Sequence, residues 1–220
     1  MKKFLIDNGK SPDEPYNARL LFWLPSDSPY GNFQLKLMKL CQQLDEANRR
    51  LSESVIFWEQ ARTEGVLPCN VYERHIFANE QAVYLIRRAV DEMIALIWCL
   101  TKWEKERVYP NKIEVDCIGG VVENPHNNQL ELFREHRGFL KTLNEIANAF
   151  KHSFVQSDIT LVGKDEPCVY VLALKYNKIK SDAKLDGVSL ARLVEEFNAF
   201  YKEGMDCLRA FSERNRITTT

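Results

Sequence analysis

The sequence lacks the motifs of several enzyme classes. It has no glycine-rich phosphate loop, no GxSxG or HExxH motif and no CxxC pair among its six cysteines. Such motifs hold phosphates, a nucleophilic serine or a metal ion, so their absence argues against familiar nucleotide-binding proteins, hydrolases and zinc enzymes. The only Glu-x-x-His tetrad begins at Glu123 and contains Pro125, which prevents the helical geometry of a di-iron centre. We therefore expect free thiols, no metal site and no cofactor.

The sequence also lacks long apolar runs and a large net charge. The longest run, 93–100, has eight residues, whereas a membrane-spanning helix needs about 20. The amino-terminal stretch before Asp7 is too short for the apolar core of a secretory signal. The formal charge of -1 means that nucleic-acid binding would need a local basic patch. We expect a cytoplasmic globular protein without a membrane partner.

The sequence is rich in apolar stripes with helical spacing, and its eight prolines separate them. Proline inside a helix costs about 3 kcal/mol, so prolines mark boundaries. Apolar residues recur every three or four positions in the segments between them. This spacing predicts helices over about 33–62, 72–106, 128–154 and 190–212. The second carries apolar residues on two sides and is expected to be central, and Ser189 is the predicted N-cap of the last.

A β-hairpin is predicted between the third and fourth helices. The β-prone runs 159–162 and 168–174 flank a short turn segment, which predicts a hairpin over 158–175. Residues 107–127 either contain a short strand or loop over the surface. The fold class is thus mainly α, a helical bundle of four main helices with an inserted hairpin. It forms a single domain over 32–220, and the proline-rich residues 1–31 form an extended arm that packs on the body.

Histidine is scarce, with four in the chain, so few groups are available as a general base near neutral pH. His75 lies near the start of the second predicted helix, where a positive charge is unfavourable, and we expect an uncharged capping or surface role. His126 lies in a loop. His136 is expected to be partly buried and hydrogen-bonded, because it lies one helical turn from apolar residues.

The fourth histidine belongs to a candidate site. Asn144, Asn148 and His152 are spaced i, i+4, i+8 and form a polar ridge on the third predicted helix, flanked by Lys141 and Lys151. One interpretation is structural: the end of the ridge ties the helix to the hairpin by hydrogen bonds. The other is a binding site made of Asn144, Asn148, His152 and Lys141, with His152, Asn148 and Lys151 as candidate catalytic residues.

The run Ala147–His152 resembles the motif of the HEPN helical domains, in which an arginine and a following polar residue precede a histidine near a helix end. HEPN domains are compact helical bundles, frequently homodimers, and many are metal-independent ribonucleases of toxin–antitoxin and phage-defence systems. Others are inactive partners or nucleotide-binding modules. The run is also similar to one in bacterial helical proteins.

Two residues of the motif match, and one does not. Asn148 and His152 fall on the polar and histidine positions, whereas Ala147 stands at the position of the arginine. The resemblance implies that His152 would act on the 2′-hydroxyl or the leaving group, that Asn148 would orient it, and that Lys151 would supply the missing cation. Lysine lacks the planar fork of arginine, so this departure argues against catalysis.

Three functions are consistent with the sequence. The first is a non-catalytic association module that forms a homodimer or binds a protein partner, since the second helix is apolar on two sides and the motif arginine is missing. The second is a metal-independent RNA-cleaving toxin or defence protein, with RNA as the partner. The third is a small-molecule-binding bundle with a pocket lined by Trp58, Trp98 and Trp103.

Overall fold

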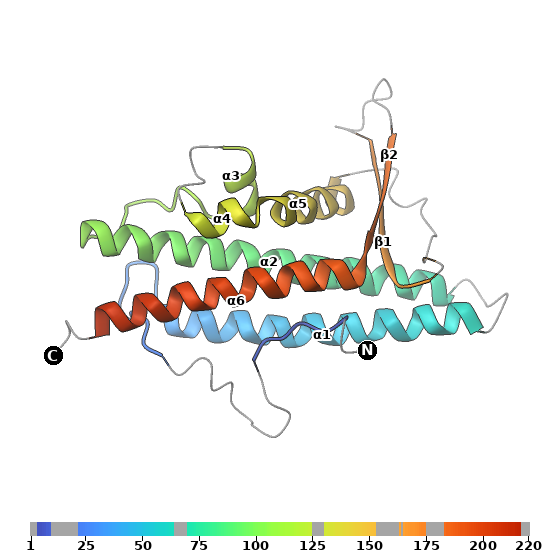
Figure 1. The fold of residues 1–220 in the computed structure, drawn as a ribbon, viewed down its shortest axis with the longest axis horizontal. Helices are drawn as coiled ribbons and strands as arrows, with labels where there is room; N and C mark the ends of the chain where they lie inside the picture. Colours follow the sequence, from blue (N-terminus) through green and yellow to red (C-terminus); the bar gives the residue numbers. More distant parts are fainter. Residues whose placement is uncertain are drawn as a thin grey trace.

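A computed structural model describes residues 4–9, 22–63, 70–124, 130–152, 163, 165–174 and 183–216. The described chain is mainly helical and has one small antiparallel hairpin (Figure 1). Its elements are α1 (Phe33–Thr63), α2 (Asn70–Glu106), α3 (Ile118–Val122), α4 (Glu131–Glu135), α5 (Arg137–His152), β1 (Cys168–Leu174), β2 (Ala183–Ser189) and α6 (Leu190–Asn215). No helix of the described residues has the length and apolar character needed to span a bilayer.

Helix α2 has the central position that its two apolar sides predicted. It lies antiparallel to α1 and contacts α3, α5, α6 and β1 (Figure 1). Buried apolar residues along its length, among them Val83, Ile86 and Met93, explain how one helix packs against several neighbours. Helix α6 crosses α1 as well, where the Cys41 thiol and the Tyr201 hydroxyl lie 3.3 Å apart.

The predicted helix over 128–154 is interrupted. The backbone leaves the helical conformation at His136 (φ -92°, ψ 13°), so α4 and α5 are separate helices. The interruption is fixed by tertiary contacts: the His136 ring packs edge-on against Phe200, and the Arg137 guanidinium donates to the carbonyl oxygen of Val122 at 2.7 Å. Such contacts have no signature in the helical periodicity, so the sequence predicted one continuous helix.

The hairpin differs from the predicted one in its second strand. Residues 168–174 form a strand as predicted, but they pair with Ala183–Ser189 in register Cys168↔Ser189 to Leu174↔Ala183. The run 159–162, which was the predicted partner, lies outside the described residues. β2 was missed because its sequence mixes charged residues with Gly187, and its Leu185 side chain is exposed.

The hairpin rests on the helices and leads directly into α6. Val169 and Val171 of β1 are buried, and β1 contacts α2 and α5 while β2 contacts α6. The Ser189 hydroxyl accepts the N–H of Arg192 at 3.3 Å, which confirms the predicted N-cap. In the predicted connection 107–127, the described residues form the short helix α3 and no strand.

The described parts of the amino-terminal segment lie against the helices. Phe4, Ile6 and Leu24 are buried. The Asn48 side chain of α1 accepts the backbone N–H of Ile6 at 2.7 Å and donates to its carbonyl oxygen at 2.9 Å. Residues 10–21 lie outside the described residues.

Candidate functional site

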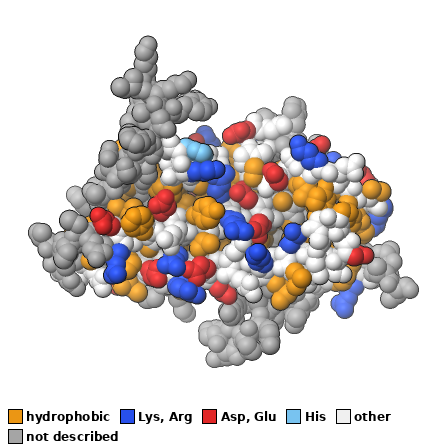
Figure 2. All heavy atoms as spheres, turned by 180° about the vertical axis from the view of Figure 1, so that it is seen from behind, with side chains coloured by type: hydrophobic (Ala, Val, Ile, Leu, Met, Phe, Trp, Pro, Cys, Tyr) orange, Lys and Arg blue, Asp and Glu red, His pale blue; other side chains and the backbone are white. Residues whose placement is uncertain are grey.

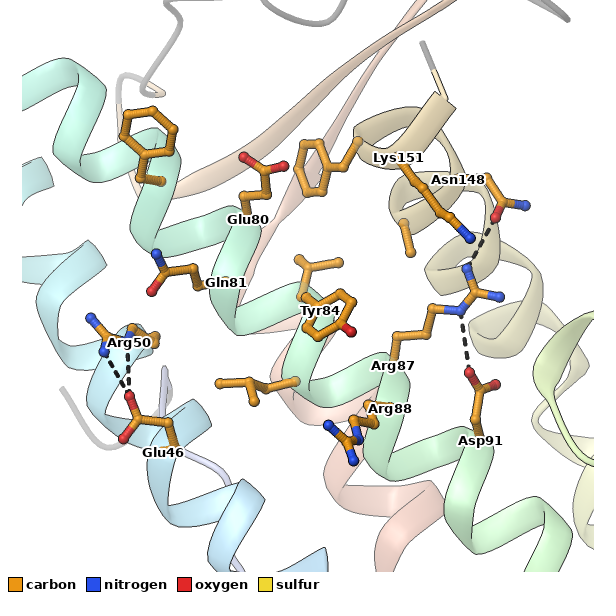
Figure 3. A pocket seen from close by; sticks show the side chains of 15 residues that line it. Glu46, Arg50, Glu80, Gln81, Tyr84, Arg87, Arg88, Asp91, Asn148 and Lys151 are labelled. Atoms are coloured by element: carbon orange, nitrogen blue, oxygen red, sulfur yellow. Dashed lines mark hydrogen bonds and ion pairs between the residues drawn. The ribbon is translucent and has the colours of Figure 1, made fainter.

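A groove of about 970 Å³ follows α2 between α1 and α5, and we call it the α2 groove (Figure 3). Glu46 and Arg50 line it from α1, and Asn148 and Lys151 line it from α5. Side chains of α2 form its floor, among them Tyr84. The groove is on the side of the molecule away from α6, where charges of both signs and apolar side chains are interspersed (Figure 2).

A chain of polar contacts crosses from α3 through α2 to α5. The backbone N–H of Ile118 donates to Asp91 at 2.7 Å, and Nε of Arg87 lies 3.5 Å from the same carboxylate. Nη1 of Arg87 then donates to Oδ1 of Asn148 at 3.0 Å. Burial raises the pKa of Asp91, while the Ile118 N–H and Arg87 act in the opposite direction. The chain thus fixes the Arg87 guanidinium at the α5 edge of the groove.

The polar ridge lies on one continuous helix, but its members have different surroundings. Asn144 is buried, with 7% of its surface exposed, and its Oδ1 has no hydrogen-bond partner among the described atoms. Asn148 is half-buried, and His152 is exposed at the last residue of α5. Of these three residues, only Asn148 lines the α2 groove. The ridge is therefore not a single open surface.

The two lysines beside the ridge also separate. Lys141 is exposed, and its Nζ lies 3.9 Å from the carboxylate of Glu145, one turn along the same helix. Lys151 lines the α2 groove together with Asn148. The structure thus brings together Asn148 and Lys151 of the sequence-predicted residues, and it adds Arg87 to them.

The sequence analysis missed the α2 contribution to the groove. Phe77, Gln81, Tyr84 and Arg88 are spaced i, i+4, i+7 and i+11, which places them on one face of α2. Phe77 and Tyr84 are 59% and 64% exposed although they are large and aromatic. Their spacing is visible in the sequence, but periodicity alone does not tell which apolar stripe of a helix is left uncovered.

Most charged groups of the groove have a local partner. Arg50 pairs with Glu46 at 2.8 Å on α1, and Arg88 pairs with Glu92 at 3.1 Å on α2. Burial raises the pKa of the Glu80 carboxyl group. Lys151 has no acidic partner among the residues that the structure describes.

The prediction that His75 has a capping or surface role is wrong, because the residue lies neither at the start of α2 nor at the surface. α2 begins at Asn70, so His75 lies beyond the first turn, where it faces α1 and is fully buried. Its Nδ1 lies 2.9 Å from the carbonyl oxygen of Ser54, and its Nε2 lies 3.0 Å from Nδ2 of Asn79. Burial lowers the pKa of His75 below its usual 6.5, so the ring is neutral at physiological pH.

The two remaining histidines outside the candidate site are His126 and His136. His136 is partly buried, as the sequence predicted. Its Nε2 lies 3.0 Å from the carboxylate of Glu203, but the predicted hydrogen bond is not formed at this nitrogen within the described residues. His126 lies outside the described residues.

The tryptophans of the third predicted site lie away from the α2 groove. Trp58 and Trp98 are buried in the body, and Trp103 packs against Tyr109 and Phe211. None of the three lines the α2 groove. Within the described residues, no three His, Cys, Asp or Glu side chains are grouped to hold a metal ion, and the five described cysteines are free.

Comparisons with protein-family models, with curated proteins and with solved structures found no match to this chain.

Proposed function

We propose that this chain, a HEPN-like bundle of the four main helices α1, α2, α5 and α6, is a non-catalytic association module that pairs with a second copy of itself through the α2 groove. The observation that carries the proposal is the exposure of Phe77 and Tyr84, 59% and 64%, on a helix that otherwise packs against several neighbours. Exposed aromatic residues that share a groove are typical of interaction surfaces, whereas single exposed apolar residues are ordinary.

The residue types of the groove support a protein interface. Tyrosine and arginine are enriched at the energetic centres of interfaces, because they combine a large contact area with directional hydrogen bonds. Tyr84 and Arg88 lie one turn apart in the groove, and Arg50 lines it from α1. The other exposed large apolar residues, Leu35, Met38, Ile56, Val108 and Leu185, lie outside the groove.

The order of charges along α2 supports a second copy as the partner. Glu80 precedes Tyr84 by one turn, and Arg87 and Arg88 follow it by one turn. Two copies of α2 that run antiparallel about a two-fold axis near Tyr84 would place Glu80 of each helix near Arg87 and Arg88 of the other. The small net charge of the chain, -1, adds little repulsion between the copies.

The proposal predicts that the protein is a dimer at micromolar concentration and that Phe77→Glu combined with Tyr84→Glu makes it a monomer. Loss of central aromatic contacts costs about 2 kcal/mol or more of association free energy. Val108→Glu is the matched control, since Val108 is 67% exposed and lies outside the groove. Light scattering measures the mass. A monomeric wild type, or a double variant that stays dimeric, would contradict the proposal. If the wild type is a monomer that binds a different protein, that protein and not a second copy is the partner.

A second candidate function, RNA cleavage without a metal ion, is favoured by one contact. The resemblance to HEPN domains lacks an arginine at Ala147, but the Arg87 guanidinium from α2 binds Asn148, the next residue of the motif. In this candidate, the Arg87 guanidinium comes from another helix, lies beside the polar position of the motif and takes the place of the missing arginine. In this candidate, His152 moves the proton, and Lys151 and Arg87 bind the scissile phosphate.

The test of this candidate is incubation of the protein with single-stranded RNA in the presence of a chelator. We expect cleavage by the wild type, and at least a 100-fold loss in His152→Ala, since general acid–base catalysis contributes roughly 100-fold or more. His152 is exposed, so the variant should keep the melting temperature of the wild type. Absence of cleavage in the wild type would exclude this function, and cleavage that survives in His152→Ala would exclude His152 as its catalytic residue.

A further inference from the structure

Strand β2 forms one edge of the two-stranded sheet. It pairs with β1 on one side, and within the described residues no strand pairs with its other side. The backbone N–H and C=O groups on that side can therefore accept a further strand, and β2 contains no proline that would prevent pairing. A sheet of only two strands is marginally stable, so an added strand would stabilise it.

The position of the hairpin leaves room for such a strand. Figure 1 shows that the hairpin projects from the bundle past α5 at the beginning of β2, whereas the end of β2 leads directly into α6. Two β2 strands that pair antiparallel run in opposite directions, so their α6 helices leave the pair at opposite ends. The two bundles would therefore lie at opposite ends of the strand pair and would not compete for the same space.

The charges of β2 are self-complementary in an antiparallel pair. Lys184 and Asp186 share one face of the strand, and Nζ of Lys184 lies 2.8 Å from the Asp186 carboxylate. If a two-fold axis passes beside Leu185, Lys184 of each copy lies opposite Asp186 of the other. The four charges then alternate in sign, both along each strand and across the pair. A lysine on an edge strand usually discourages pairing, but here the facing strand places a carboxylate opposite it.

The opposite face of β2 gains an apolar contact in the same arrangement. Leu185 is 53% exposed, and its partner in the register of the hairpin is Leu172 of β1. Beside the two-fold axis, Leu185 of one copy would lie directly opposite Leu185 of the other. Two leucines from each copy would then form one row across a four-stranded sheet, and the row would cover apolar surface that Leu185 exposes in the single chain.

From the unpaired edge and its self-complementary side chains we infer that β2 is a second self-association surface, at which it pairs antiparallel with β2 of another copy. The inference goes beyond the proposed dimer and does not depend on it, because no residue of β2 lines the α2 groove. A chain that uses both surfaces forms assemblies larger than a dimer. The facing segment, 183–187 of each copy, is short, so this contact is expected to be weak and to form at high protein concentration.

The experiment is sedimentation of the full-length Phe77→Glu, Tyr84→Glu variant, which lacks the groove contact, over a range of concentrations. We expect a monomer at about 5 μM and a dimer that accumulates toward about 1 mM, with slower hydrogen exchange at the β2 amides that do not pair with β1. A variant that stays monomeric at about 1 mM overturns the inference. A variant that is already dimeric at about 5 μM, and becomes monomeric when Lys184→Asp is added, supports the β2 surface and contradicts the groove contact.

Charge reversal in the same variant separates β2 pairing from other contacts. Lys184→Asp places carboxylates opposite each other across the axis, and Asp186→Lys does the same with ammonium groups, so each should weaken self-association about 10-fold or more. An equal mixture of the two restores opposite signs across the pair and should associate like the parent. Both side chains are exposed, so folding should be unaffected. Lys202→Asp, at an exposed lysine of α6, is the control and should also associate like the parent. Equal association of the three variants, or no recovery in the mixture, would overturn the inference.

Discussion

Replacement of Asn79 by leucine is expected to lower the free energy of unfolding by about 3 kcal/mol, because it removes the centre of a buried polar network. Oδ1 of Asn79 accepts the Ser54 hydroxyl at 2.6 Å, and Nδ2 donates to His75 at 3.0 Å and to the carbonyl oxygen of Cys168 at 3.2 Å. Leucine has a similar volume but no polar group. The ring nitrogen of His75 and the Cys168 carbonyl oxygen would lose a partner, at a cost of roughly 1–3 kcal/mol each.

Urea denaturation of Asn79→Leu measures this loss. The matched control is Gln42→Leu, which replaces an exposed amide on α1 and should change the free energy of unfolding by less than about 0.5 kcal/mol. The network joins α1, α2 and β1, so hydrogen exchange should also show faster opening of the hairpin in Asn79→Leu. Equal stability of the two variants would show that the network contributes little.

The second large effect is a loss of stability in mild acid through His75. Burial lowers the pKa of His75 from 6.5, so in the range just below pH 6.5 the unfolded chain binds a proton that the folded chain does not. The free energy of unfolding therefore falls as the pH falls through this range, and it continues to fall until the pKa of the folded state is reached. Protonation would also set Nε2–H against the donor of Asn79.

Comparison with His75→Gln isolates this contribution. Glutamine keeps a donor and an acceptor but does not titrate, so the stability advantage of the wild type at pH 8 should shrink as the pH falls to 5. The comparison cancels Glu80 and Asp91, whose raised pKa values act in the opposite direction because their folded forms bind protons more readily. An independent measure is the ring resonance of His75, which should keep its neutral position to a lower pH in the folded protein than in the unfolded chain. Parallel stability profiles would contradict the prediction.

The periodicity of the sequence predicted the long helices within a few residues. α1 and α2 follow it closely, since each keeps apolar residues at helical spacing over many turns, and burial of these residues is what stabilises a helix. α6 continues to Asn215 beyond the predicted end, where Nδ2 of Asn215 donates to Phe211 and to Glu104 of α2. The end of a helix thus depends on contacts that the local pattern does not contain.

The candidate site was predicted only in part. Asn148 and Lys151 share a face of α5 by their spacing, which is a local property. Arg87 lies 61 positions away from Asn148 in the chain, and only the packing of α5 against α2 brings the two together. The same packing covers Asn144, which the sequence placed on the same ridge.

By itself, the sequence determined where the long helices α1, α2 and α6 lie and which residues on them are apolar, because both follow from interactions within a few residues along the chain. The tertiary structure decided which apolar stripe stays uncovered, which strand pairs with β1, and which polar side chains of different helices meet. These depend on how whole elements pack against one another, and many packings are compatible with the same local pattern. The exposure of Phe77 and Tyr84 and the contact between Arg87 and Asn148 are both of this kind.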